Sequence, residues 1–104
     1  MLFRSPMKGL GHMVMTGVLV AVQLMNVSAY TYTGNVTASG ASPTPYRTAA
    51  CDHLPMGTMV YVNGRVFVIE DRFGGGYSDR LDLFLPTEAE CWEFGRQYLW
   101  VDVF

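Results

Sequence analysis

The chain has 104 residues, which allows one domain at most. Residues 30–104 contain five arginines, no lysine and nine acidic residues, a formal charge of 5 − 9 = −4. This composition excludes a basic patch for nucleic acid or for an anionic membrane surface, and it suits a neutral or amphoteric partner.

The first 29 residues have the order of an export signal. Arg4 and Lys8 lie in a stretch without acidic residues, and a mostly apolar run over residues 13–27 follows. Val27, Ser28 and Ala29 follow and place small residues at the positions that a signal peptidase recognises, which predicts a cut after Ala29. We therefore predict a signal peptide over residues 1–29 and a secreted or cell-envelope location. An uncleaved anchor is the alternative, although the run is shorter than the about 20 residues of a usual membrane span.

The predicted mature domain, residues 30–104, contains both cysteines of the chain, Cys51 and Cys91. Outside the cytoplasm two cysteines pair more often than they stay free. A disulfide that closes a loop of about 40 residues would stabilise a small domain by about 3–4 kcal/mol. Two buried thiols or a metal pair are the alternatives. A metal is disfavoured because His53 is the only histidine of this domain and the spacing is not that of a zinc site. We predict a disulfide, with no metal and no cofactor.

From residue 30 onward the pattern predicts short strands separated by turns. The predicted strands cover residues 30–33, 36–39, 47–51, 58–62, 65–71, 80–85 and 97–104. Asn63 and Gly64 predict a tight hairpin turn because both turn positions favour a positive φ. Several short strands in so small a domain indicate a small barrel.

One helix is predicted after the strand at residues 80–85. Thr87 and Glu90 have the spacing of a capping box, and Gly95 ends the helix. Its apolar side is expected to consist of Ala89, Trp92 and Phe94. The sequence therefore predicts a mainly β domain with one short helix.

Three aspartates stand in informative settings. Asp52 precedes a turn, Asp71 ends a predicted strand before a glycine-rich stretch, and Asp82 lies mid-strand. A carboxylate in a strand costs free energy unless it faces water, finds partners or takes up a proton. Asp82 paired with Arg80 on an exposed face is one interpretation, and a protonated general acid is another. Asp52 and Asp71 suit either turn stabilisation or support of catalysis.

Eight short segments follow one another along the chain in an informative order. They are Thr37-Ala38-Ser39-Gly40, Ala50-Cys51-Asp52, Leu54-Pro55-Met56-Gly57-Thr58, Val60-Tyr61-Val62-Asn63-Gly64, Glu70-Asp71-Arg72-Phe73-Gly74-Gly75, Arg80-Leu81-Asp82-Leu83-Phe84, Glu90-Cys91 and Phe94-Gly95-Arg96. The series resembles the 3D domain, named for three aspartates, which occurs in membrane-bound lytic transglycosylases and in muralytic stationary-phase proteins. Ser28-Ala29-Tyr30 also matches the first strand of that family, which a cut after Ala29 would interrupt.

The resemblance implies a small six-stranded double-psi β-barrel and cleavage of peptidoglycan glycan strands. By motif, Asp82 would act as acid and then as base, with Asp71 and Asp52 close by in the same groove. The candidate substrate-binding residues are Tyr30, Thr37, Gly40, Gly74 and Gly75. The alternative is a wall-binding or structural module with the same fold and no turnover. The implied partner is peptidoglycan, with no nucleic acid and with membrane contact only through the N-terminal segment.

Overall fold

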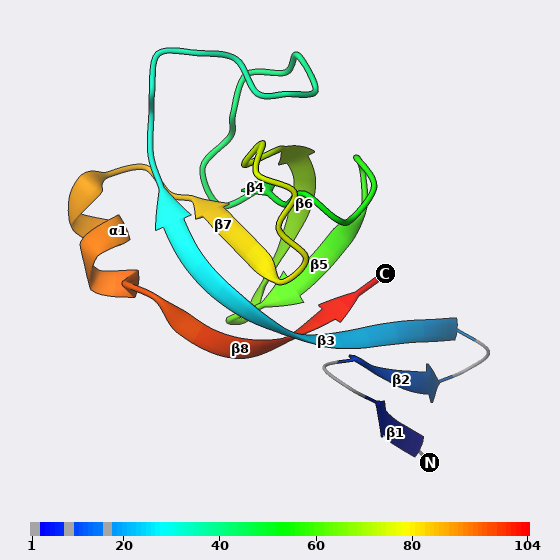
Figure 1. The fold of residues 1–104 in the computed structure, drawn as a ribbon. Coiled ribbons are helices and arrows are strands. Elements are labelled where there is room, and N and C mark those ends of the chain that lie inside the picture. Colours follow the sequence, from blue (N-terminus) through cyan, green and yellow to red (C-terminus); the bar gives the residue numbers. More distant parts are fainter. Residues whose placement is uncertain (1–2, 8–9, 16–17) are drawn as a thin grey trace.

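The computed structural model describes residues 3–7, 10–15 and 18–104, with side chains for residues 21–104. This part of the chain forms one mixed β-sheet and one short helix, α1 (Glu88–Phe94) (Figure 1). The strands are β1 (Phe3–Met7), β2 (Leu10–Met15), β3 (Val18–Tyr30), β4 (Thr48–Ala50), β5 (Met59–Val62), β6 (Arg65–Asp71), β7 (Arg80–Phe84) and β8 (Gln97–Val103).

Six of these strands close into a barrel. They follow one another in the order β3, β7, β4, β6, β5 and β8, and β8 pairs with β3 to complete the circle. The pairs β3–β7 and β4–β6 are parallel, whereas the other pairs of the barrel are antiparallel. The predicted double-psi β-barrel with one short helix is thereby confirmed. The hairpin β1–β2 continues the sheet along the first half of β3 (Figure 1).

The core of the barrel follows from period-two alternation along its strands. Met25 and Val27 on β3 and Leu81 and Leu83 on β7 point inward, and each is at most 2% exposed. Asp82 lies between the two leucines and therefore points to the outer side, as predicted. Further core side chains come from the remaining strands and include Val60, Val62, Phe67, Ile69 and Val101.

Strand β3 overlaps the predicted export signal. Residues 21–27 pair with β8 and residues 26–30 pair with β7, so the predicted cut after Ala29 falls inside a strand that is paired with β7 at that point. The barrel therefore includes β3, which begins before the predicted domain boundary at Tyr30. The cleavage itself stays a prediction, and residues 1–2, 8–9 and 16–17 of the predicted signal lie outside the described residues.

The segment after β3 differs from the prediction. Tyr30 ends β3, and the predicted strands at residues 30–33 and 36–39 are replaced by a loop. Within it, the Gly40 amide donates to the Thr37 carbonyl and the Thr37 amide donates to the Ala41 carbonyl. These local bonds close a turn and leave the extended pairing of residues 36–39 unformed, with Gly40 at a φ of 87°.

The predicted hairpin and helix boundaries are confirmed. Asn63 and Gly64 have φ values of 53° and 80°, as a tight turn between β5 and β6 requires. The Thr87 hydroxyl accepts the Glu90 amide, and Gly95 caps the end of α1. The predicted apolar side of α1 is confirmed only for Phe94, which packs against the core together with Cys91. Ala89 and Trp92 are exposed instead, and Trp92 is 84% exposed.

The predicted disulfide is absent, since Cys51 and Cys91 are both free thiols. Cys51 follows β4 and is fully buried in the core, with its Sγ 3.3 Å from Nδ1 of His53. Cys91 lies on α1 beside β3 and is half-buried. The two thiols therefore have different surroundings, and the barrel is held by its closed sheet and core without a covalent crosslink.

Reductant is expected to leave the stability of the protein unchanged. Because both thiols are free, the melting temperature measured by circular dichroism should be the same with and without dithiothreitol. Two thiols should react with Ellman's reagent after denaturation in the absence of reductant. A loss of about 3–4 kcal/mol on reduction would instead reveal the disulfide.

Candidate functional site

Asp82 lies in the middle of β7, directly across from Ser28 on the parallel strand β3. The Ser28 hydroxyl donates a hydrogen bond of 2.8 Å to Oδ1 of Asp82. The same hydroxyl accepts a bond of 3.2 Å from the Arg80 guanidinium. Ser28 therefore separates Arg80 from Asp82, and the predicted direct ion pair between them is replaced by a bridge through a hydroxyl.

The environment of Asp82 favours its protonated form more than water does. Burial raises the pKa of the Asp82 carboxyl, and the negative charge of Asp71 adds to the rise. The Ser28 hydrogen bond and the charges of Arg80 and Arg96 oppose it, but the net pKa stays above the ordinary value. Desolvation of a mid-strand carboxylate is thus the leading effect, and one of the two predicted neighbours contributes.

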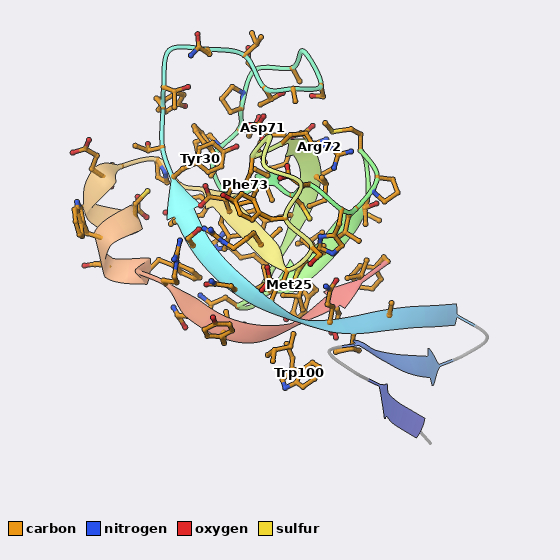
Figure 2. The ribbon with its side chains drawn as sticks, in the orientation of Figure 1. Met25, Tyr30, Asp71, Arg72, Phe73 and Trp100 are labelled. Carbon is orange, nitrogen blue, oxygen red and sulfur yellow. The ribbon has the colours of Figure 1, made fainter. Side chains whose placement is uncertain are left out.

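Asp71 lies at the end of β6 and is tied to β3 through a tyrosine. Its Oδ2 accepts a 3.0 Å bond from the Tyr30 hydroxyl, and its Oδ1 accepts 2.9 Å bonds from the amides of Ala38 and Arg72. Tyr30 and Asp71 lie side by side near the end of β3 where the chain leaves the barrel (Figure 2). Burial, followed by the charge of Asp71, raises the pKa of Tyr30, so this phenol remains a hydrogen-bond donor.

Asp52 differs from the other two aspartates in its partners, because its carboxylate binds backbone amides alone. Its carboxylate accepts four backbone amides of the glycine-rich loop, those of Phe73 (2.7 Å), Gly74 (3.0 Å), Gly75 (3.0 Å) and Tyr77 (3.1 Å). Partial burial alone would raise the pKa of Asp52, but these four bonds outweigh it and lower the pKa. Asp52 is therefore an ionised clamp for the loop, which fits the interpretation of turn stabilisation, while its support of catalysis stays a prediction.

The loop that Asp52 binds, residues 73–77, is connected to Asp82 through Arg80 and Ser28. The ring of Phe73 meets the ring of Tyr77 edge-on, with 5.6 Å between their centroids. The guanidinium of Arg80 lies 4.9 Å from the Phe73 ring centroid, within the range of a cation–π contact. Asp52 thus holds Phe73, Phe73 packs on Arg80, and Arg80 binds the serine that contacts Asp82.

Replacing Asp52 by alanine is expected to loosen this loop. Amide hydrogen exchange measured by NMR should quicken about tenfold or more at Phe73, Gly74, Gly75 and Tyr77, because their shared acceptor is lost. In the wild type, the stabilisation is present above the ordinary Asp pKa of about 3.9 and is lost as the pH falls through the lower pKa of the folded state.

Asp79→Ala is the matched control, because Asp79 belongs to the same loop and contributes a backbone carbonyl to Asn26. Unchanged exchange at the four amides in Asp52→Ala, or equal acceleration in both variants, would contradict the clamp.

The predicted substrate-binding residues are placed unequally. Gly74 and Gly75 direct their amides to Asp52, and Gly40 closes the turn that follows Thr37. Thr37 is buried, and its hydroxyl contacts Ser39 and the Ala41 carbonyl within its own loop. Of the five, Tyr30 alone both contacts a predicted catalytic carboxylate and lines a hollow.

A hollow of about 630 Å³ lies between the end of β3 and α1. Its lining residues are Ser28, Ala29, Tyr30, Thr31, Glu88, Cys91, Trp92, Gly95 and Arg96. Ser28 links this hollow to Asp82, which itself is not a lining residue. The sequence interpretation missed Ser28 because it was assigned to the signal, and it missed Trp92 because that residue was assigned to the core. The match of residues 28–30 to the family's first strand was the signal that could have found Ser28.

A second hollow of about 310 Å³ is lined by Tyr46, Arg65, Glu90, Glu93 and seven further residues. The Tyr46 hydroxyl donates to Glu90, and the Arg65 guanidinium lies 4.2 Å from the centre of the Tyr46 ring. None of the three aspartates lines this hollow. We therefore assign it no part in the site.

A cysteine and a histidine also lie within contact distance. His53 has its Nδ1 3.3 Å from the Cys51 thiol and its Nε2 2.8 Å from Oε1 of Gln23 on β3. This order resembles an activated nucleophile, a base and an orienting amide. Cys51 is 0% exposed, however, and burial raises the pKa of its thiol. The trio therefore ties the segment after β4 to β3 and offers no accessible thiolate.

Within the described residues, no group of three or more His, Cys, Asp or Glu side chains comes together as a metal site would require. The same part of the chain holds no helix with the length and apolar composition needed to cross a bilayer. Comparison of the chain with models of known protein families and with curated proteins finds no match.

Proposed function

We propose that the protein cleaves peptidoglycan glycan strands by a lytic-transglycosylase reaction, with Asp82 as the acid and then the base. One observation carries the proposal: a largely buried carboxyl in mid-strand, raised in pKa, with Ser28 as its hydrogen-bond partner and Asp71 as a negatively charged neighbour. A buried carboxyl whose pKa is raised by its surroundings is the usual form of a general acid in glycoside cleavage. The resemblance to the 3D domain supports the same assignment.

The reaction needs one carboxyl in two protonation states. Asp82 gives its proton to the glycosidic oxygen between N-acetylmuramic acid and N-acetylglucosamine, and that bond breaks. The resulting carboxylate then takes the proton of the muramic acid 6-hydroxyl. The 6-oxygen bonds to C1 of the same sugar, which forms a 1,6-anhydro ring. The acid is regenerated without water, so no second carboxylate is required as nucleophile, in contrast to the two-carboxylate hydrolases.

The other site residues support Asp82 in different ways. Asp71 adds negative charge that favours a protonated Asp82, and Tyr30 holds Asp71 in place through its hydroxyl. Ser28 orients the Asp82 carboxyl. Arg80 and Arg96 act in the opposite direction, because their positive charges stabilise the ionised carboxylate. This stabilisation of the carboxylate by Arg80 and Arg96 suits the second step of the reaction, in which Asp82 acts as a base.

Incubation of the protein with purified peptidoglycan tests the proposal. The released fragments should carry 1,6-anhydro-muramyl ends, detected by mass spectrometry. Fragments with reducing ends would mean hydrolysis, and the absence of released fragments would refute the lyase activity.

A wall-binding module without turnover is a second candidate, and the exposed aromatic side chains favour it. Trp92, Tyr98 and Trp100 are 84%, 69% and 54% exposed, and Trp100 points away from the barrel (Figure 2). Exposed aromatic rings offer flat apolar surface on which the faces of sugar rings can pack. Co-sedimentation with peptidoglycan but no released fragments would favour this candidate.

A further inference from the structure

The end of β3 has a free backbone edge on the side of the hollow. Strand β8 pairs with β3 up to Val27, whereas β7 accompanies β3 up to Tyr30. The Asn26 amide and the Tyr30 carbonyl bond toward the β7 side, to Asp79 and Leu85 respectively. Because backbone groups alternate in direction along a strand, those of Ala29 point to the other side, where the hollow lies. Thr31, just after the end of β3, also lines the hollow.

The hollow offers this edge together with charges of both signs. Arg96 and Glu88 line it, and no ion pair joins either residue to another side chain within residues 21–104. Trp92 contributes a large apolar ring that is 84% exposed. A free strand edge, an apolar ring and separate positive and negative groups are the features with which proteins bind extended peptides.

We propose that this hollow binds the peptide stem of peptidoglycan as an added strand beside Ala29 and Thr31. Arg96 pairs with a carboxylate of the peptide, Glu88 pairs with an amine of its diamino acid, and Trp92 packs on its aliphatic carbons. The identity of the peptide rests on the proposed function. The binding of an extended peptide carrying both charges rests on the hollow alone.

The position of the hollow fits this occupant. Ser28 lines it and donates to Asp82, so a muramic acid residue cleaved at Asp82 lies next to it. In peptidoglycan the stem peptide is attached to that same sugar through its lactyl group. Positive charge from Arg96 also reaches Asp82, which places the peptide carboxylate and the reacting carboxyl in one electrostatic environment.

A comparison of two substrates tests the inference in the full chain. Peptidoglycan strands with stem peptides should be cleaved with a kcat/KM about tenfold or more above that of strands stripped by an amidase. Arg96→Gln should remove this preference, and Arg65→Gln, in the second hollow, should retain it. Equal rates of the wild type on both substrates, or a preference retained in Arg96→Gln, would overturn the inference.

A binding measurement separates this inference from the proposed activity. Asp82→Asn protein is titrated with free synthetic stem peptide, and amide and indole shifts are followed by NMR. Shifts at Ala29, Thr31 and the Trp92 indole that disappear with Arg96→Gln support the subsite, even if no strand is cleaved by the wild type. No shifts, or shifts unaffected by Arg96→Gln, overturn the subsite, even if the lyase activity is present.

Discussion

A protein that begins at Tyr30 should not fold, whereas one that begins at Val18 should. The shorter chain lacks nearly all of β3, including Val22, Met25 and Val27, which are at most 1% exposed. Three such side chains contribute about 5–9 kcal/mol by their burial, and a domain has a total stability of about 5–15 kcal/mol. The deletion also leaves β7 and β8 with open edges, because both pair with β3.

Circular dichroism and proton NMR dispersion of the two purified fragments check this prediction. Residues 18–104 retain every strand of the barrel and should melt cooperatively. Residues 30–104 should show no cooperative transition and little dispersion. A well-dispersed spectrum of the shorter fragment would contradict the placement of β3. It would also restore the domain boundary that the export pattern predicts.

Replacing Asp82 by asparagine should abolish cleavage while making the fold more stable. Loss of a general acid typically costs about 10²–10⁴-fold in rate, and asparagine has no proton to give. Its carbonyl still accepts the Ser28 hydroxyl, so the local geometry is retained. Anhydro-muramyl products should therefore fall by about 10²–10⁴-fold in Asp82→Asn, measured on peptidoglycan at neutral pH.

The expected gain in stability follows from the raised pKa of Asp82. When the pKa of a group is higher in the folded state than in the unfolded state, the group stabilises the fold at acid pH. This contribution to the free energy of unfolding is lost as the pH rises through the folded-state pKa. At neutral pH the carboxylate thus destabilises the barrel, and Asp82→Asn should melt at a higher temperature than the wild type. The difference should vanish below the ordinary Asp pKa of about 3.9.

Asp71→Asn separates the roles of the two carboxyls. It should retain activity, with the high-pH limb of the rate profile moved to lower pH, because a charge that raises the pKa of Asp82 is removed. Asp79→Asn, on the neighbouring loop, should match the wild type in rate and profile. Full activity of Asp82→Asn, or lost activity with a lower melting temperature, would contradict the catalytic assignment.

Local chemistry was sufficient to predict much of the barrel. Asn63 and Gly64 demanded positive φ values and so fixed the β5–β6 hairpin. Thr87, Glu90 and Gly95 defined both ends of α1. The alternation around Asp82 correctly placed its side chain opposite the leucines. In each case the deciding interaction lies within a few residues, which is where sequence patterns are most informative.

Tertiary contacts decided the features that the sequence interpretation missed. An apolar run after basic residues fits an export signal as well as a buried strand, and only the pairing with β7 and β8 shows that residues 21–30 belong to the barrel sheet. The exposed position of Trp92 depends on how α1 rests on the barrel. Asp52 and Asp71 have similar settings in the sequence, and only the folded loops show that Asp52 binds four amides and Asp71 binds Tyr30.

The pairing of β3 also determines the order in which the chain can assemble. Within the barrel its neighbours are β7 and β8, and the Ser28–Asp82 contact spans 54 positions. A ribosome therefore releases β3 well before its partners exist, and the barrel closes only when the last strand is free. Contacts of such sequence separation slow folding. A chain whose barrel stays open until β8 has been synthesised has time to engage chaperones while it is still unfolded.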